Sequence, residues 1–574
     1  MIDYKHVRLA AGRRWLVTWI FLVLAACLIW RAVDLQLKEG EFLQNHADAR
    51  HLRVVETAVS RGMILDRNGN HLAISTPVQS VWVEPVEFLG QKSRWQALAA
   101  VLETTVEHFD ALVAPRREKR FVYLRRHIAP HEAQQIAALK IPGVHLAEEQ
   151  KRYYPSSEVT SHLLGFTNVD DVGQEGIELA FNELLSGKAG LRRVMRDRLG
   201  RVIADVERIQ PREPAEDLHL SIDKRLQYAA YRELKTAVSA HQARAGSMVV
   251  ADIRSGEILA LVNQPSFNPN NRDDFAGERY RNRAVTDLFE PGSTIKPFTV
   301  AAALEAGSYD ESTKVQTAPG HFKVGKHVIR DIRNFGEISI AGVLERSSNV
   351  GASRIALSLE AETLWHVFRA AGFGSLTDSG LPGEVFGVFH DHRNWREIEH
   401  ATLAFGYGLS VNALQLTRAY MTLADDGFIK PLSIVRTSKP AWREPALSTA
   451  TAKTVRRMLK KVVANGTGKA AQVDGFAVAG KTGTVHKIST QGYVEDQYLS
   501  LFAGMLPVEQ PRFVAVVVID EPHSGEYFGG RVAAPVFANV MTEAVRIFNL
   551  TPSEPSATEF PELTALASFD EVWR

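Results

Sequence analysis

Apolar and polar positions along the chain first set a membrane segment apart from the rest. Residues 15–30 form an apolar run interrupted only by Thr18, and extension to Val33 gives enough length for a membrane span. Basic residues cluster before the run, which by the positive-inside tendency predicts that residues 1–14 are cytoplasmic. We therefore predict a single transmembrane anchor at residues 15–33, with the bulk of the chain on the far side of the membrane.

Two alternative interpretations of this run stay open. It could be a cleaved signal peptide, although no small-x-small site is followed by polar sequence. Residues 24–27 also resemble a lipoprotein signal in which Cys27 would carry the lipid, but the apolar run continues through Trp30. Cys27 is the only cysteine, so the chain can form neither an internal disulfide nor a cysteine-based metal site.

The next region alternates between strand-like and helix-like patterns. Residues 34–50 are polar and predict a juxtamembrane helix, and the Asn-Gly pair at 68–69 predicts a hairpin turn. A polar segment with two prolines at 211–217 predicts a domain boundary, so we expect a non-catalytic α+β pedestal domain at residues 51–217. Within it we expect strands at 53–59, 80–84 and 121–124, and helices at 94–102 and 130–139.

Composition narrows the class of protein only slightly. The 574 residues are 45% apolar and 23% charged, an ordinary balance for a globular protein with ample material for its cores. The net charge of +1 argues against a nucleic-acid partner. An acidic cluster at 170–178 fits no calcium-loop spacing and predicts salt bridges at the surface or between domains. Residues 218–548 hold the candidate chemistry, and residues 549–574 are expected to form a flexible tail.

The candidate chemistry begins with Ser293 and Lys296. They follow a Pro-Gly turn and precede an apolar run at 298–306 that predicts a buried helix. Their spacing places both on one helical face, with Ser293 near the helix start, where free N–H groups favour negative charge. A lysine that its surroundings keep neutral can take the proton of a serine. A second match, Ser221-x-x-Lys224, lies at a strand end where no helix opens at the serine.

Two more short motifs follow this pair. Ser347-Ser348-Asn349 precedes a helix-like run at 350–357, whereas the Ser-x-Asn matches at Ser266 and Ser410 lie in a loop and after a turn. Lys481-Thr482-Gly483-Thr484 occurs once and is expected to end an apolar strand at 476–480, where glycine lets a ligand backbone approach. All three motifs in this order are typical of penicillin-binding proteins and class A β-lactamases.

The chain resembles the class B penicillin-binding proteins, which are monofunctional peptidoglycan D,D-transpeptidases. The resemblance runs from the anchor to about residue 545. Two residues depart from the pattern of the division-specific branch, to which the chain is most similar: Val485 replaces a usual alanine, and Arg531 replaces a usual apolar residue. Outside the catalytic motifs the resemblance is carried by residues 61–69, 173–178, 406–408, 415–416 and 527–537.

The resemblance implies a multidomain α+β fold in which a transpeptidase domain, a five-stranded antiparallel sheet flanked by helices, follows the anchor and the pedestal. The active site would lie between this sheet and a helical subdomain. No metal and no organic cofactor is implied. The implied roles are Ser293 as nucleophile, Lys296 as its base, Ser347 as proton carrier to the leaving amine, Asn349 as the group that orients Lys296, Lys481 as the cation that lowers the pKa of Lys296, and Thr482, Gly483 and Thr484 as the groups that hold the substrate carboxylate and the oxyanion.

The implied function is the cross-linking of peptidoglycan stem peptides through a serine acyl-enzyme, in septal wall synthesis during cell division. β-Lactam antibiotics would be covalent inhibitors, and the bulk of the chain would be periplasmic, anchored in the bacterial inner membrane. Implied partners are a membrane glycosyltransferase of the FtsW type and other division proteins. Alternatives are an elongation-type or conditional paralogue, a non-catalytic β-lactam-binding scaffold or sensor, and a penicillin hydrolase or carboxypeptidase. Ligand contact by His486 and Lys487 stays open.

Overall fold

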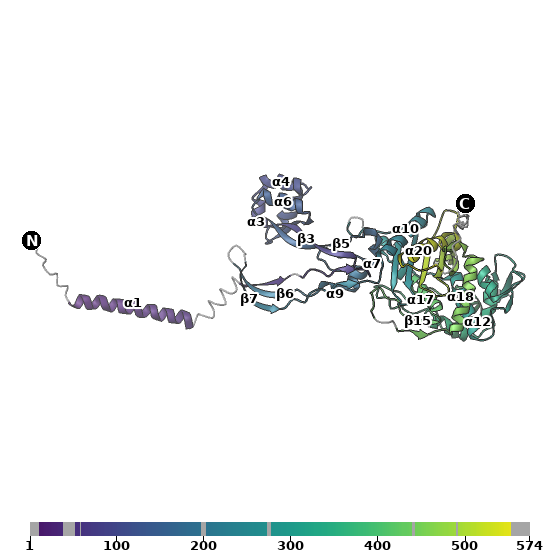
Figure 1. Cartoon of the computed structure of the whole chain (residues 1–574). Coiled ribbons are helices and arrows are strands. Elements are labelled where there is room, and N and C mark those ends of the chain that lie inside the picture. Colours follow the sequence, from purple (N-terminus) through teal and green to yellow (C-terminus); the bar gives the residue numbers. More distant parts are fainter. Residues whose placement is uncertain are drawn as a thin grey trace, which may run out of the picture. The chain divides into compact units, whose positions relative to one another are not determined.

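The first described element is one long apolar helix, α1 (Ala11–Leu37). Its segment Gly12–Gln36 is long and apolar enough to cross a membrane and contains the span predicted at 15–33. The juxtamembrane helix predicted at 34–50 overlaps the end of α1, and its residues 38–50 lie outside the described part of the chain. The computed structural model describes residues 11–37, 52–57, 59–196, 202–271, 277–438, 442–489 and 492–552 (Figure 1).

The chain divides into two compact units, and the smaller one contains a three-stranded antiparallel sheet. This unit comprises residues 1–60 and 187–215, and the larger unit comprises residues 61–186 and 216–574. The predicted pedestal therefore contributes to both units, and its bounds stay a prediction. The strand expected at 53–59 is confirmed with slightly earlier bounds. The sheet has the order β1-β6-β7, with β1 (Leu52–Thr57), β6 (Gly190–Arg196) and β7 (Val202–Gln210).

In the larger unit, residues 61–186 form an α+β region whose sheet is completed by a strand from the next segment. The Asn-Gly turn predicted at 68–69 joins β2 to β3, and Gly69 has the positive φ of +84° that such a turn needs. The strands expected at 80–84 and 121–124 and the helices expected at 94–102 and 130–139 are confirmed, with somewhat different bounds. The elements are β2 (Ile64–Leu65), β3 (His71–Val83), α3 (Pro85–Leu89), α4 (Trp95–Val101), α5 (Val106–Val113), β4 (Val122–Ile128), α6 (Pro130–Leu139), β5 (Val144–Tyr153) and β8 (Leu218–His219).

A buried ion triad ties this region together. Arg61 Nε lies 2.7 Å from one oxygen of Glu178, and Arg152 Nε lies 2.6 Å from the other. All three side chains are at most 2% exposed. Glu178 belongs to the acidic cluster that was expected to form salt bridges at the surface or between domains. That expectation is wrong for Glu178, because two arginines from distant segments enclose its carboxylate in the interior.

The second half of the larger unit is built on a five-stranded antiparallel sheet, as the family resemblance implied. The strand order is β10-β9-β19-β18-β17, which places β17 at an edge. The strands are β9 (Ala245–Asp252), β10 (Ile258–Gln264), β17 (Ala479–Ser489), β18 (Gly492–Leu506) and β19 (Phe513–Asp520). On one face lie α10 (Lys224–Ala240) and α20 (Ala534–Ile547), and on the other lies α17 (Ala413–Ala424).

Alternation of side chains along β19 explains how both faces of this sheet are covered. Val514 and Val516 pack against α17, whereas Ala515 and Val517 pack on the side of α10 and α20. All are fully buried, and the strand is apolar from Phe513 to Ile519, as expected for a strand inside a three-layer structure.

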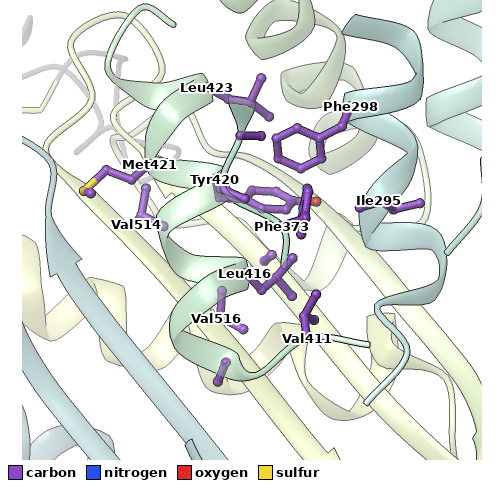
Figure 2. Packing of buried hydrophobic residues seen from close by; sticks show 14 of the residues in the cluster. Ile295, Phe298, Phe373, Val411, Leu416, Tyr420, Met421, Leu423, Val514 and Val516 are labelled. Carbon is purple, nitrogen blue, oxygen red and sulfur yellow. The ribbon is translucent and has the colours of Figure 1, made fainter. Parts of the chain in front are cut away.

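Tyr420 of α17 connects the sheet to the turn and helix that follow Gly292. Figure 2 shows its ring among Phe298, Phe373 and Leu416, with Val514 and Val516 beneath α17. Its hydroxyl donates a hydrogen bond of 2.8 Å to the carbonyl of Thr294, and its ring meets that of Phe298 edge to face. The segment around Ser293 is thus held against a rigid core.

The helical subdomain surrounds α12 (Lys296–Glu305), which confirms the buried helix predicted at 298–306. It packs against α14 (Asn349–Leu357), the helix expected at 350–357, and against α18 (Thr449–Ala464). The remaining helices and strands of the larger unit, from both of its halves, are α7 (Ser161–Leu164), α8 (Gly176–Ala180), α9 (Asn182–Ser186), α11 (Arg283–Thr286), β11 (Lys314–Gln316), β12 (His321–Val324), β13 (His327–Arg330), β14 (Glu337–Ser339), α13 (Ile340–Arg346), α15 (Ala361–Ala370), α16 (Glu397–Leu403), β15 (Phe428–Ile429), β16 (Glu444–Pro445) and α19 (Gly529–Val532).

Candidate active site

Ser293 lies on a tight turn that leads into α12. A 3₁₀ turn covers Gly292–Ile295, and the α-helix begins at Lys296. The α-helix therefore starts three residues after Ser293. Gly292 has a φ of +53°, and Pro297 occupies the first helical turn, where its missing N–H has no cost. Ser293 is partly exposed and Lys296 is fully buried, so the amine is shielded while the serine hydroxyl stays accessible.

The amine of Lys296 is surrounded by four oxygen atoms. Its Nζ lies 2.6 Å from the Ser347 carbonyl and 2.7 Å from Asn349 Oδ1, both of which can only accept. It also lies 3.0 Å from Ser293 Oγ and 3.1 Å from Ser347 Oγ. A neutral amine has two N–H groups and one lone pair. If the two acceptors take both N–H groups, the lone pair is left for a serine O–H.

Burial and a neighbouring cation make the neutral form of Lys296 favourable. Loss of hydration lowers its pKa well below the usual lysine value, and the charge of Lys481 lowers it further, while Asp331 acts in the opposite direction. Burial also lowers the pKa of Lys481, to about 7. Ser347 Oγ lies within hydrogen-bonding distance of both amines, 2.9 Å from Lys481 Nζ and 3.1 Å from Lys296 Nζ. It also lies 3.0 Å from Ser293 Oγ.

Ser347 is placed by an unusual backbone conformation between two helices. It ends α13 with a φ of +58°, and Ser348 caps the next helix, α14. Asp331 secures this turn, because its carboxylate accepts bonds from the Ser348 hydroxyl at 2.5 Å and from the backbone N–H groups of Asn349 and Val350 at 2.6 and 3.0 Å. Sequence reasoning missed Asp331, which lies in a loop without a local motif.

Lys481 to Thr484 occupy the edge strand β17, with a different position in the strand from the one expected. The sequence predicted that this motif ends a strand at 476–480, and that is wrong: β17 begins at Ala479 and continues to Ser489. The cause is pairing over its length with β18, which no local pattern reveals. In the described chain, β17 pairs only on this side, so its outer edge can accept a peptide backbone.

The two threonines of this motif lie toward α19 and the loop before β17. Thr482 Oγ1 lies 2.8 Å from Thr467 Oγ1, and Thr484 Oγ1 accepts a 3.0 Å bond from the N–H of Gly529. Since the Thr484 oxygen accepts, its own O–H can donate to a ligand. Val485, one of the two departures from the division-specific pattern, is buried and points toward Gly292, where the absence of a side chain leaves space for it.

These residues open into a cleft of about 960 Å³ that contains Ser293, Ser347, Asn349, Thr482 and Thr484. Aromatic side chains form part of its wall, and Tyr498 and Tyr527 stack with ring centroids 4.1 Å apart. His486 lines the cleft, whereas Lys487 turns away and forms ion pairs with Asp520 and Glu521. Sequence reasoning assigned no role to the other lining residues, which include Ile332, Arg346, Tyr407, Thr467, Lys469, Tyr498, Tyr527, Phe528 and Arg531.

The competing serine motifs have structural roles. Ser221 is fully buried, and its Oγ lies 2.7 Å from the Ile258 carbonyl and 3.0 Å from two further carbonyls. Ser266 lies beside Tyr231 and Glu158, and the Ser410 hydroxyl accepts a bond from a backbone N–H. Neither is among the residues that line the cleft, whereas the cleft residues Ser293 and Ser347 both lie within hydrogen-bonding distance of Lys296 Nζ.

Known proteins share this architecture. The family described as "Penicillin binding protein transpeptidase domain" matches residues 246–542, and "Penicillin-binding Protein dimerisation domain" matches residues 56–220. The chain is 41% identical over 549 residues to the peptidoglycan D,D-transpeptidase FtsI of Escherichia coli (strain K12), with 93% of each chain covered.

Solved structures agree with this match. The apo transpeptidase domain of penicillin-binding protein 3 from Burkholderia pseudomallei is 41% identical, with a TM-score of 0.54, and the match covers 58% of this chain and 98% of that one. A peptidoglycan synthetase from Bifidobacterium adolescentis shares the fold over 89% of this chain and 99% of its own, with a TM-score of 0.70 at 24% identity. The predicted family, fold and enzyme class are confirmed, while the roles of single residues stay predictions.

Proposed function

The chain belongs to the FtsI branch of the class B penicillin-binding proteins, and from this premise we propose that it cross-links peptidoglycan stem peptides through an acyl-enzyme on Ser293. The observation that carries the proposal is the buried amine of Lys296, 3.0 Å from Ser293 Oγ and 2.7 Å from Asn349 Oδ1. A shielded amine with its N–H groups engaged is suited to take a proton from the serine.

In the acylation step, Ser293 Oγ attacks the carbonyl carbon of the penultimate D-alanine while its proton passes to Lys296. The negative charge on the carbonyl oxygen is held by the backbone N–H groups of Ser293 and Thr484; each donor of this kind contributes about 3 kcal/mol. Ser347 then carries a proton to the amine of the leaving D-alanine, helped by the nearby ammonium group of Lys481. The C–N bond breaks and an ester on Ser293 remains.

The edge strand and its threonines orient the donor peptide for this attack. The hydroxyls of Thr482 and Thr484 donate to the terminal carboxylate, and the peptide backbone pairs with the free edge of β17. Gly483 keeps the motif close to the core, because a Cβ there would lie 3.0 Å from Leu501 and 3.1 Å from Thr294. The amine of a second stem peptide then attacks the ester and forms the cross-link. For the acyl-enzyme to survive until that amine arrives, water must not be activated, and none of the described residues that line the cleft is a carboxylate that could do so.

A labelling and chase experiment tests this function. Fluorescent penicillin should form a covalent adduct on Ser293 that survives excess unlabelled drug for many minutes, because the tethered leaving group blocks the acceptor. Mass spectrometry of the labelled peptide identifies the serine. Loss of the adduct within seconds, with multiple turnovers of hydrolysed drug, would show a penicillin hydrolase instead. No adduct at all would favour a non-catalytic scaffold.

The anchor and the family also support a location and partners. Among the described residues, one helix is long and apolar enough to cross a membrane, and basic residues precede it. This supports a single-pass inner-membrane protein whose bulk is periplasmic. The partners we propose are a glycosyltransferase of the FtsW type and other division proteins. A reporter fused to the C-terminus should be active only in the periplasm. Depletion of the chain should give filaments, whereas spheres would indicate an elongation enzyme.

A further inference from the structure

The catalytic cleft has an unbalanced charge. Among the described residues that line it are Arg346, Lys469, His486 and Arg531, and none is an aspartate or glutamate. Arg346 lies over the ring of Phe335 at 5.7 Å, and no carboxylate of the described chain pairs with Arg346, Lys469 or Arg531. By contrast, Lys487, which follows a lining residue but turns away, is paired with two acids. The cleft thus keeps cations free that could meet a ligand.

Arg531 is held at one end of this cleft by the backbone of α19. The N–H of Gly529 donates to Thr484 Oγ1 at 3.0 Å, and a methyl group on Gly529 would lie only 2.3 Å from the carbonyl oxygens of Gly483 and Leu501. A methyl group on Gly530 would lie 2.4 Å from the Thr467 carbonyl oxygen. Two adjacent glycines therefore press α19 against the threonine motif, and this close packing fixes where the exposed side chain of Arg531 begins.

Lys469 reaches the same end of the cleft from another segment. It begins the short 3₁₀ turn Lys469–Ala471, two residues after Thr467, and the Thr467 hydroxyl lies 2.8 Å from that of Thr482. The segments that bear Arg531 and Lys469 therefore meet at the Thr467–Thr482 pair. In the proposed mechanism this pair belongs to the end of the cleft that holds the terminal carboxylate.

We propose that Arg531, supported by Lys469, determines specificity at the carboxylate end of the cleft. The two cations attract anionic ligands and disfavour ligands that carry a positive charge next to their carboxylate. This inference rests on the proposed acylation of Ser293 and adds a selectivity to it. The physical basis is Coulombic: two unit charges within several ångströms at a protein surface interact by enough to change a rate severalfold, and salt screens the effect.

Cephalothin and cephaloridine make a matched pair of probes. They share the acyl side chain and the ring carboxylate, but cephalothin has a neutral acetoxymethyl group on the ring where cephaloridine has a cationic pyridiniomethyl group. The measurement is the second-order rate of acylation of Ser293 by each drug, using the full-length chain in detergent. Because the two drugs differ in intrinsic reactivity, the quantity compared between variants is the ratio of the cephaloridine rate to the cephalothin rate.

Arg531→Gln should raise this ratio by about threefold to tenfold at low salt, and Arg531→Glu should raise it further. Arg531→Lys should keep the native ratio, and Lys469→Gln should raise it to a smaller extent. At about 1 M salt the differences should largely disappear. Arg546→Gln, which removes an exposed arginine from α20 outside the cleft, controls for net charge and should leave the ratio unchanged.

The failures of the two proposals are distinguishable. If the native chain forms no Ser293 adduct with either drug, the proposed function fails, and the inference fails with it. If both adducts form but Arg531→Gln and Arg531→Glu leave the ratio unchanged within about twofold, only the role of Arg531 is overturned. Thermal unfolding of each variant shows whether a change in rate comes from a loss of fold. The ratio is insensitive to the fraction of folded protein, since both drugs report on the same preparation.

Discussion

Two sites in the larger unit bury positive charge, and they do so in opposite ways. Arg61 and Arg152 are buried on the two oxygens of Glu178, so each guanidinium has a carboxylate within 2.7 Å. Lys296 and Lys481 are equally buried, but the atoms around their amines are neutral oxygens from serine, asparagine and backbone groups.

The difference separates arginines that stay charged from Lys296, which must lose its charge to accept a proton. Arginine keeps its proton under all ordinary conditions, and a carboxylate between two guanidiniums makes a strong link between distant segments. A lysine amine can become neutral when burial removes hydration and no carboxylate restores it. Even Asp331, the nearest acid to influence Lys296, uses its oxygens on the turn at Ser347–Val350 and forms no direct bond to the amine.

The largest effect is expected for the nucleophile itself. Ser293→Ala should abolish covalent labelling by fluorescent penicillin, because Ser293 is the proposed nucleophile and Ser347, the other serine beside Lys296, is proposed only to carry a proton. Ser221→Ala is the control, since Ser221 belongs to the competing motif but bonds only to carbonyl groups. It should label normally, with a modest loss of stability. Gel fluorescence and mass spectrometry measure both outcomes, and an adduct on Ser221 in either variant would overturn the assignment.

Replacement of the base should slow acylation strongly and change initial binding little. Lys296→Ala removes the proposed acceptor of the serine proton, so the first-order acylation rate should fall by about 10²- to 10⁴-fold. Lys481→Ala should weaken both steps, because Lys481 also supplies charge that attracts the substrate carboxylate. Stopped-flow kinetics separate the binding step from acylation. Equal behaviour of the two variants would mean that the roles are assigned wrongly.

In the arginine triad, the corresponding change should affect stability and leave chemistry intact. Glu178→Gln leaves two buried guanidiniums without a carboxylate, which should reduce the free energy of unfolding by about 3–5 kcal/mol. The acylation rate of the folded fraction should stay native. Glu213→Gln is the control, because its ion pair with Lys188 is largely exposed and should contribute little. Urea unfolding, followed by tryptophan fluorescence, gives the midpoints; a native midpoint for Glu178→Gln would refute the triad's role.

The acylation rate should fall at both low and high pH, with one lysine responsible for each limb of the profile. Protonated Lys296 has no lone pair, so the rate should fall as the pH drops through its lowered pKa. Lys481 acts as a cation, and its pKa of about 7 predicts that the rate also falls as the pH rises through that value. Lys481→Met should be slower and should lose the alkaline limb. Acylation rates across the pH range test both signs; an alkaline limb that survives in Lys481→Met would contradict the assignment.

The sequence was sufficient to predict the site residues that belong to short motifs. Ser293 with Lys296, and Ser347 with Asn349, are set by local spacing, so their order along the chain was sufficient to predict that they lie together. Their catalytic roles stay predictions. Asp331 and Thr467 were missed because only tertiary packing brings them to the motifs, and nothing near them in sequence distinguishes them from other loop residues.

Errors in the predicted fold have a similar origin. The motif at Lys481 appeared to end a strand because glycines interrupt the apolar run, but pairing with β18 continues the strand past them. Glu178 was expected to form salt bridges at the surface or between domains, because nothing nearby in the sequence shows that its buried partner is Arg61, 117 residues away. In both cases a contact made by distant parts of the chain overrides the local pattern.

The smallest effect is expected for Asp331, an acid that holds the turn at Ser347 and also influences the charge of Lys296. Asp331→Asn keeps the size of the side chain but removes a negative charge and weakens the bonds to the turn. Loosening of Ser347 and Asn349 should slow acylation by about tenfold. Loss of the charge should at the same time lower the pKa of Lys296 further, because Asp331 favours its protonated form. The acid limb of the rate profile should therefore move to lower pH while the maximum falls. A purely structural role would lower the maximum without moving the limb, so the pH profile of Asp331→Asn distinguishes the two roles. Asp310→Asn, at an exposed acid that caps a turn away from the cleft, is the matched control and should change neither quantity.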